Sequence, residues 1–216
     1  MKKLTPEERA TIYNKRFPTH PPLSYNGRWI TGGWYFFRGK KGKIYGSYPD
    51  MYLKRLYTLF PDCSRILHLF SGALESDEKG IRFDISSEFH PNVCGDVREL
   101  ERYFEPNTFD LVLADPPYGK EDFAKYGCEP FNKGKVTESL YSIVQPQGFM
   151  VWLDTILPKY KGKYWQLMGM IAFAQGPGMR CRLISIFQSK KEIGDIEIVN
   201  EISDQDLNSK PRNAIF

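Results

Sequence analysis

The chain has 216 residues, of which 41% are hydrophobic and 26% charged, with 30 Lys and Arg against 26 Asp and Glu. This length fits one domain, and this composition excludes a disordered or fibrous chain. The four cysteines lie far apart without a Cys-x-x-Cys pair, which argues against a metal site and a disulfide framework. No apolar run has the roughly 20 residues of a membrane span or the form of a signal peptide. We therefore expect a soluble, cytoplasmic protein without a membrane partner.

Positive charge is concentrated at the N-terminus. Residues 1–47 hold ten basic and two acidic side chains, a net charge of +8, interleaved with nine aromatic rings. Cations that neutralise phosphates and rings that stack on bases are what a nucleic-acid surface uses. The alternative is a solvated basic face over a small aromatic core, and charge alone does not decide between the two.

The first elements expected along the chain are a helix near residues 6–16, within a Pro-rich arm, and a hairpin over residues 28–44. The hairpin is predicted to turn at Thr31-Gly32-Gly33. A second helix is expected over residues 51–60, where apolar residues recur at helical spacing.

Short apolar runs then alternate with helical stretches. Strands are predicted at residues 65–70, 80–85, 109–114 and 148–154, with helices at residues 97–104 and 135–144. This alternation is typical of an α/β fold with a mostly parallel sheet covered on both faces. Two last strands, at residues 166–173 and 180–187, predict an antiparallel C-terminal hairpin that turns at Gln175-Gly176-Pro177-Gly178.

Ligands bind at the carboxyl ends of the strands in such a sheet, so the residues after each strand are candidates for a site. Ser71 and Gly72 follow the first strand, where small residues let a ligand approach the backbone. Asp84 ends the next strand, where a carboxylate can hold the ribose hydroxyls of a nucleoside cofactor. Asp96 precedes the following helix, and it could equally serve as the N-cap of that helix.

The strongest signal is Asp115-Pro116-Pro117-Tyr118, directly after the strand at residues 109–114. Two prolines fix φ and remove two N–H donors, which leaves the neighbouring carbonyl groups free as acceptors. The Asp115 carboxylate and the Pro116 carbonyl then form a rigid acceptor edge beside the Tyr118 ring. An exocyclic amine on a planar ring fits this edge. The alternative is a turn that only ends the strand with Tyr118 in the core, but such turns usually use Gly, Asn or Ser.

These four residues resemble the (D/N/S)PP(Y/F/W) motif of class I S-adenosylmethionine-dependent methyltransferases that methylate amino groups, including DNA adenine-N6 and cytosine-N4 enzymes. HLFSGAL at residues 68–74 is similar to the DxFxGxG cofactor loop of that family, and GSYP at residues 46–49 to its upstream motif. The sequence departs from the family at His68, where an acidic residue is usual, and at Leu74, where a glycine is usual.

The resemblance implies a Rossmann-like class I methyltransferase fold, S-adenosylmethionine as cofactor, and direct methyl transfer at Asp115, Pro116, Pro117 and Tyr118. The cofactor-binding residues that it implies are Tyr48, Pro49, Phe70, Ser71, Gly72, Asp84, Asp96 and Val97. We expect a basic aromatic arm and hairpin at residues 1–44, a methyltransferase domain at residues 45–188, and an acidic tail at residues 189–216.

Three functions remain open. We favour a small DNA adenine or cytosine methyltransferase over an RNA amino-methyltransferase of the ribosomal guanine-N2 type. The third is an inactive methyltransferase-fold subunit that binds nucleic acid or a partner, against which the intact motif argues. Because 28 residues follow Gln188, target recognition has to come from the basic arm, the loop at residues 119–134, or a partner protein.

The charge of residues 1–47 predicts contacts with a nucleic-acid backbone. Affinity for duplex DNA should then fall steeply with salt, with a logarithmic slope of about −0.9 for each neutralised phosphate. Fluorescence anisotropy over a series of KCl concentrations measures this slope. Binding that does not respond to salt would leave only the solvated face over an aromatic core.

Overall fold

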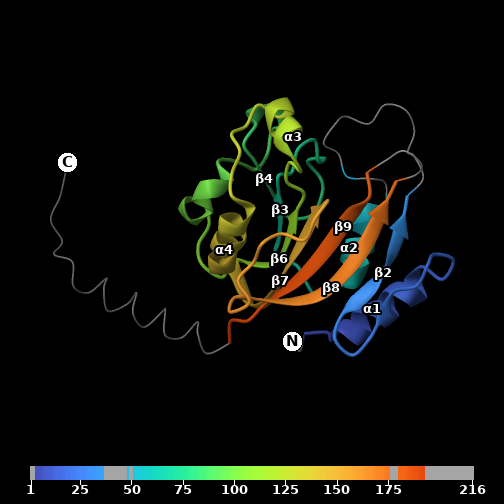
Figure 1. Cartoon of the computed structure of the whole chain (residues 1–216). Helices are drawn as coiled ribbons and strands as arrows, with labels where there is room; N and C mark the ends of the chain where they lie inside the picture. The colour runs from blue at the N-terminus through green and yellow to red at the C-terminus, as the bar shows by residue number, and fades with distance from the viewer. Residues whose placement is uncertain (1–2, 37–47, 49–50, 176–179, 193–216) are drawn as a thin grey trace, which may run out of the picture.

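A mixed sheet runs through the whole described part of the protein. The computed structural model describes residues 3–36, 48, 51–175 and 180–192, and nine strands pair there in the order β1-β2-β8-β9-β7-β6-β3-β4-β5 (Figure 1). The strands are β1 Ser24–Tyr25, β2 Ile30–Tyr35, β3 Ile66–Leu69, β4 Ile81–Asp84, β5 Val93–Cys94, β6 Phe109–Ala114, β7 Val144–Asp154, β8 Trp165–Ala174 and β9 Arg182–Ser189.

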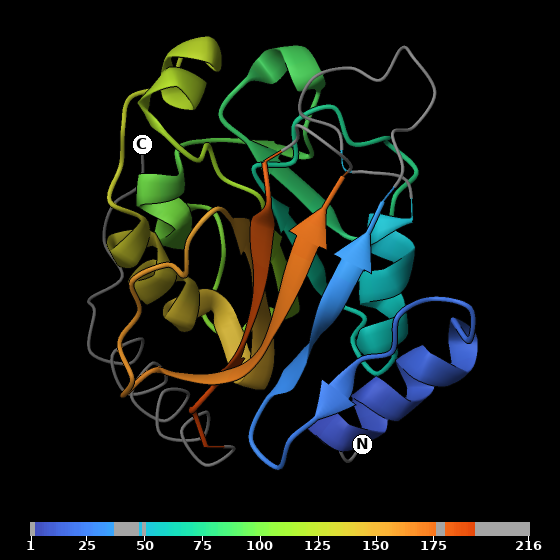
Figure 2. The same ribbon diagram turned by 45° about the vertical axis from the view of Figure 1, so that its right-hand side comes forward.

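The strand directions confirm the predicted fold class. Strands β5, β4, β3, β6 and β7 are parallel, and β8 runs parallel to β2. β9 is antiparallel to both of its neighbours, β7 and β8, as the predicted C-terminal hairpin requires (Figure 2). The turn predicted for this hairpin lies mostly outside the described residues, as do Pro49 and residues 193–216 of the acidic tail. The fold is Rossmann-like α/β.

Helices cover both faces of the sheet. They are α1 Pro6–Arg16, α2 Tyr52–Leu59, α3 Lys120–Lys125 and α4 Lys133–Ile143, together with the short 3-10 helices η1 Ser87–Phe89 and η2 Val97–Arg102. Within the described ranges, none of these helices combines the length and apolar composition that crossing a bilayer demands. The helix predicted at residues 6–16 is confirmed as α1, whereas the one predicted at residues 97–104 is the 3-10 helix η2.

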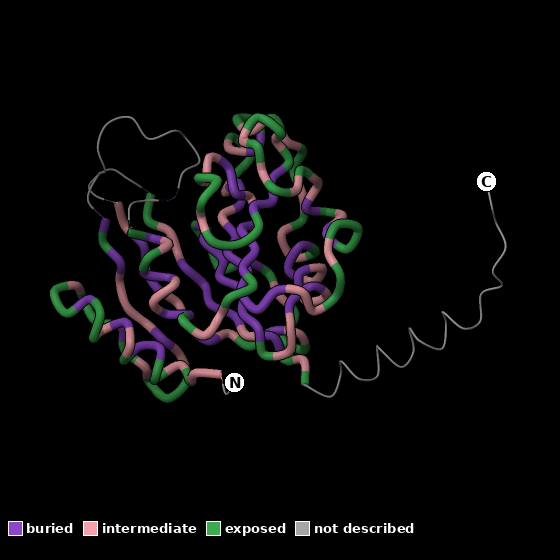
Figure 3. The backbone as a smooth tube through the Cα atoms, turned by 180° about the vertical axis from the view of Figure 1, so that it is seen from behind, coloured by how far each residue is buried: buried purple, intermediate pink, exposed green. Residues whose placement is uncertain are grey.

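Alternation along β6 explains why there are two cores. Leu111 and Leu113 point into a cluster with α1 and α2, and Val112 and Ala114 point into a second cluster with η2 and α4. Because side chains alternate along a strand, a six-residue strand that is buried throughout is covered on both sides. Buried backbone accordingly follows the central strands in Figure 3.

The N-terminal hairpin differs from the prediction. β2 continues without a break through Thr31-Gly32-Gly33, so the turn predicted there is wrong. The turn lies at residues 26–29 instead, where the Asn26 side chain accepts two backbone hydrogen bonds. A Cβ at Gly32 would lie 2.6 Å from Cδ2 of Leu23 and 3.2 Å from the Pro22 carbonyl oxygen, so a larger residue there would require Leu23 to shift. Gly32 therefore reflects a close approach of two segments and not a turn.

The aromatic residues of the N-terminal segment mostly pack inward. Tyr13 of α1 stacks on Trp34 of β2 with a ring-centre distance of 5.6 Å, and Phe17 and Phe36 are buried beside them. These four rings form part of the core and cannot stack on bases. Tyr35 differs, since it is 60% exposed. These buried rings therefore form the small aromatic core that was the alternative to a nucleic-acid surface.

Arg9 joins α1 to the end of α2. Its guanidinium donates to both carboxylate oxygens of Asp62 at 2.7 and 2.8 Å and to the Leu59 carbonyl at 2.8 Å. It also lies over the rings of Phe60 and Phe149, at 4.9 and 4.4 Å from their centres. Burial acts to raise the pKa of Asp62, but the hydrogen bonds and charge of Arg9 outweigh it and hold this pKa below its usual value. This cation belongs to the fold and is not available to a phosphate.

Replacing Arg9 with alanine should destabilise the protein strongly. Loss of one partner leaves the other buried and unpaired, which costs about 3–5 kcal/mol in the free energy of unfolding. Arg16→Ala, which removes an exposed arginine from the same helix, should change it by less than about 0.5 kcal/mol. Urea denaturation measures both variants. Equal stabilities for the two would show that the Arg9–Asp62 pair does not join α1 to α2.

Candidate active site

The growth of the sheet changes direction between β3 and β6. From β3 the chain adds β4 and β5 on one side, then returns to β6 and continues to β7 on the other side. The crevice outside the carboxyl ends of the strands at such a point is where open α/β sheets bind ligands. Leu69 and Ala114, the last residues of β3 and β6, are paired in the sheet. The turns that begin at Phe70 and Asp115 therefore start side by side.

The turn after β3 has unusual backbone geometry. Phe70 has φ 62° and Gly72 has φ 48°, both in the left-handed region. A bulky residue rarely adopts this conformation, and such strain concentrates at ligand sites. The buried Asp84 carboxylate holds the turn, because its two oxygens accept hydrogen bonds from the backbone N–H of Gly72 at 2.8 Å and of Ser86 at 2.9 Å. Asp84 is thus at the predicted place, and it also shapes the turn.

Two buried polar atoms beside this turn lack a hydrogen-bond partner within the described residues. They are the hydroxyl oxygen of Ser71, which is 2% exposed, and Nδ1 of His68, which is fully buried. Nε2 of His68 lies 2.7 Å from the Lys79 carbonyl, so the neutral ring carries its proton on Nε2 and has an acceptor at Nδ1. Burial lowers the pKa of His68 and favours this neutral ring. Unsatisfied buried polar atoms are rare in proteins, so these two atoms are candidates to contact a polar ligand at this turn.

Tyr48 lies next to the same turn. Its ring stacks on Tyr52 of α2 at 5.0 Å, and the centre of its ring is 6.3 Å from that of His68. The cofactor-binding role that the family resemblance implies for Tyr48 stays a prediction. Phe70, from the turn itself, stacks on Phe131 at 5.5 Å with the rings 6° from parallel. The loop at residues 119–134 therefore packs back onto the turn after β3.

Asp96 and Val97 have structural roles in the protein as described. Asp96 is the N-cap of η2, and its carboxylate accepts hydrogen bonds from the backbone and the guanidinium of Arg98. The hydrogen bond from the Arg98 side chain lowers the pKa of Asp96. Val97 is buried in the core. The N-cap alternative for Asp96 is thus present in the structure, and a role for either residue toward a cofactor stays a prediction.

Asp115 offers one carboxylate oxygen to a ligand. Its Oδ1 accepts a hydrogen bond of 2.5 Å from the Tyr118 hydroxyl, while within the described residues no donor contacts Oδ2. The Tyr118 oxygen in turn accepts a hydrogen bond of 2.9 Å from Nη1 of Arg182. Burial raises the pKa of Asp115 to about 6, against the opposing effects of the Tyr118 hydrogen bond and the Arg182 charge. The carboxylate is therefore ionised at neutral pH and available as an acceptor.

A second ion pair supports the Asp115–Tyr118 turn. Nζ of Lys133 lies 2.6 Å from Oδ2 of the fully buried Asp154 and donates to the Tyr118 carbonyl at 3.3 Å. The Trp152 indole also donates to Asp154, at 3.3 Å. Neither Lys133 nor Asp154 was predicted as a site residue from the sequence. Asp154 ends a predicted strand, so it could have been chosen as a candidate in the same way as Asp84. Lys133 and Arg182 stand in no sequence motif that points to the site.

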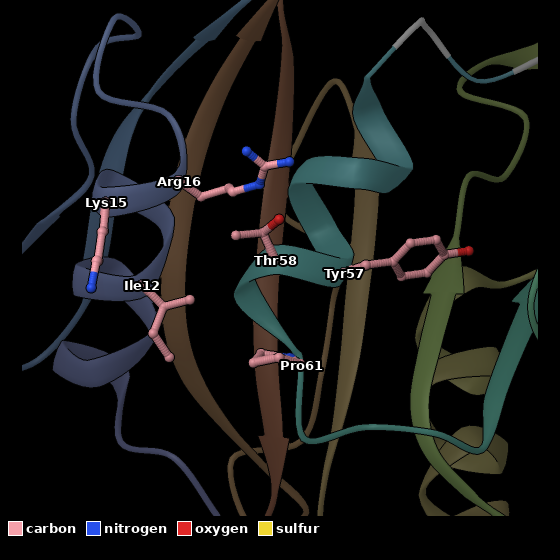
Figure 4. Close-up of a pocket in the computed structure, with 6 residues that line it drawn as sticks. All are labelled: Ile12, Lys15, Arg16, Tyr57, Thr58 and Pro61. Carbon is pink, nitrogen blue, oxygen red and sulfur yellow. The ribbon is translucent and has the colours of Figure 1, made fainter.

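A separate groove of about 530 Å³ lies between α1 and α2 (Figure 4). It is lined by Ile12, Lys15, Arg16, Tyr57, Thr58 and Pro61. Tyr57 directs its ring away from α1 and donates a hydrogen bond of 2.8 Å to Glu78. The groove lies between two helices that pack on one face of the sheet. It contains no carboxylate that could act as an acid or base, so the two turns are the better candidate for chemistry.

Lys161 and Lys163, basic residues between α4 and β8, each have a partner within the described residues. Lys161 pairs with Glu138 of α4 at 2.7 Å, and Lys163 lies over the Tyr164 ring at 4.6 Å. This segment runs along α4 toward the start of β8 (Figure 1). Both lysines are exposed, as in a solvated loop.

No protein-family description matches the chain, and no curated protein matches it. Solved structures do. TrmN from Thermus thermophilus is 17% identical over 67% of this chain and 50% of its own, with a TM-score of 0.49. An rRNA methylase from Streptococcus thermophilus is 10% identical over 59% of this chain and 87% of its own, with a TM-score of 0.40. The chain thus spans half the length of TrmN. At these identities, functional assignment rests on the residues of this chain.

Asp84→Ala should weaken binding of S-adenosylmethionine, the ligand implied by the sequence. It removes charge-assisted hydrogen bonds worth about 1.5–3 kcal/mol, which corresponds to a loss of roughly 10- to 100-fold in affinity. Asp77→Ala removes an exposed carboxylate from the same connection and should leave affinity unchanged. Isothermal calorimetry measures both. An Asp84→Ala protein that is folded and binds as tightly as wild type would exclude Asp84 from the site.

Proposed function

We propose that this protein is an S-adenosylmethionine-dependent methyltransferase that acts on an exocyclic amine of a nucleobase in nucleic acid. One observation carries the proposal. At the point where the sheet changes direction, the acceptor edge of Asp115 and Pro116 starts beside a strained turn. Buried atoms of Ser71 and His68 near that turn find no hydrogen-bond partner among the described residues. One turn fits a polar cofactor, and the other fits the amine that receives the methyl group.

Four described residues would hold the cofactor. Ser71 and Nδ1 of His68 offer unsatisfied polar atoms, Asp84 offers the remaining lone pairs of its carboxylate, and Tyr48 offers a ring face. When bound, S-adenosylmethionine supplies a methyl group on a positively charged sulfur. Asp84 is the carboxylate that fits ribose hydroxyls, because it ends β4, one strand from the turn.

Asp115 and Pro116 would orient the amine. Oδ2 of Asp115 and the Pro116 carbonyl accept one N–H each, which turns the nitrogen lone pair out of conjugation with the ring and toward the methyl group. The Asp115 charge also stabilises the positive charge that develops on the nitrogen. These are positioning and electrostatic contributions, and they require no covalent link to the protein.

DNA with an adenine or cytosine target is the first candidate substrate, because the Asp115–Tyr118 motif resembles that of the DNA enzymes. RNA is the second candidate, because ribosomal guanine-N2 methyltransferases share the motif and one solved structure similar in fold is described as an rRNA methylase. Extrusion of a base from a duplex costs a few kcal/mol, so single strands of either kind should react most readily.

Asp115→Ala should slow methyl transfer by about 10²–10³-fold, as for loss of one contact that stabilises a transition state. Single-turnover transfer of labelled methyl groups to single-stranded DNA and RNA measures this and identifies the substrate. Glu121→Ala, an exposed acid in the following helix, is the matched control and should react as wild type. Calorimetry should show that Asp115→Ala still binds the cofactor.

Two results would overturn the proposal. A wild-type rate for Asp115→Ala would remove the carboxylate from the chemistry. A wild-type protein that binds S-adenosylmethionine and methylates neither DNA nor RNA would remove the nucleobase as the substrate.

A further inference from the structure

Arg182 reaches the candidate site because β9 runs antiparallel to its neighbours β7 and β8. The other strands near the site end there, but β9 is antiparallel, so its first residue lies at the same edge of the sheet. The pairing of Leu183 with Asp154, the last residue of β7, fixes this position. A side chain 64 residues from Tyr118 in sequence thereby enters hydrogen-bond distance of the motif.

Three contacts hold the Arg182 guanidinium. Nη1 donates to the Tyr118 hydroxyl oxygen at 2.9 Å, and Nη2 donates to the side-chain oxygen of Gln175. The guanidinium carbon lies 4.1 Å from the centre of the Phe173 ring, the cross-strand neighbour on β8. Over the ranges that the structure describes, no carboxylate forms an ion pair with Arg182. The negative charge joined to it by the hydrogen-bond chain is Asp115, through the Tyr118 hydroxyl.

We propose that Arg182 is a positioning residue that fixes the Tyr118 hydroxyl against Oδ1 of Asp115 and so directs Oδ2 toward the substrate amine. This inference rests on the proposed function. The Tyr118 oxygen accepts from Arg182, and its single proton is therefore directed at Asp115. Without Arg182, the phenol is free to rotate away and the carboxylate loses its fixed orientation.

The charges around Asp115 support this arrangement and set its pH dependence. The titratable and charged groups that act on it come from four elements: Tyr118 in its own turn, Arg182 on β9, Lys133 on α4 and Asp154 on β7, with the phenols of Tyr48 and Tyr52 nearby. Burial raises the pKa of Asp115, Asp154 raises it further, and Tyr118, Arg182 and Lys133 lower it. Burial also keeps the pKa of Tyr118 well above its usual value, so the phenol stays a donor. Removal of Arg182 should therefore raise the pKa of Asp115.

The test compares Arg182→Gln with Arg180→Gln, which removes an exposed arginine two residues away. Carbon-13 NMR of the Asp115 carboxyl group during a pH titration needs no substrate, so it reads the contact even if methyl transfer is never seen. The midpoint should lie at about 6 in wild type and Arg180→Gln, and roughly one pH unit higher in Arg182→Gln. The acidic limb of kcat should move by the same amount, with KM little changed.

Tyr118→Phe supplies the second arm. It removes the hydroxyl that connects the two charges, so it should also raise the midpoint, and Arg182→Gln should then add less than it does in wild type. Arg182→Lys keeps the positive charge but loses the planar guanidinium. Compared with Arg182→Gln, it should bring the Asp115 titration midpoint back toward the wild-type value, but it should restore kcat less completely. An unchanged midpoint in Arg182→Gln would overturn the proposal. A raised KM with an unchanged kcat profile would do so too, because it would assign Arg182 to a substrate phosphate.

Discussion

Pairing of β3 with β6 is the constraint on which the candidate site depends. These strands lie side by side although 39 residues separate the last residue of one from the first of the other. Their neighbours extend in opposite directions, so the two turns start at the point where the growth of the sheet reverses. The turn after β3 carries the buried acceptors and the turn after β6 carries the acceptor edge. Any loss of register between Leu69 and Ala114 would move one turn relative to the other.

The buried carboxylates of the site are balanced by cations that come from other helices and strands. Asp154 at the end of β7 binds Lys133 at the first residue of α4, and Asp115 connects through Tyr118 to Arg182 on β9. Removal of charges from water is costly unless hydrogen bonds and opposite charges compensate. Lys133 also holds the Tyr118 carbonyl, so the same turn is fixed at its backbone by one cation and at its hydroxyl by the other. The motif is therefore rigid for reasons beyond its two prolines.

The parts of the fold that could be predicted are those encoded locally. Apolar runs located the strands that carry the site, and the residue after each run pointed to Asp84 and Asp115. Contacts between distant segments left no such signal, which is why Arg182 and Lys133 were missed. Local patterns gave a wrong prediction where tertiary packing selects the residue. Gly32 was interpreted as part of a turn, but it lies within β2, close to Leu23. Asp96 was ambiguous between a ligand and a cap because both uses need a carboxylate before a helix.

The packing explains why histidine stands at position 68, where the methyltransferase family that the sequence resembles usually has an acidic residue. The side chain is fully buried against Tyr48 and between strands, where an unpaired carboxylate would be costly. A neutral imidazole costs less, and it satisfies one nitrogen at the Lys79 carbonyl while it keeps an acceptor at the other. Because burial holds the pKa of His68 below its usual value, this acceptor persists at neutral pH and is lost only on acidification. The position thus keeps one hydrogen-bond acceptor without a negative charge, and Asp84 remains the buried carboxylate that holds the turn.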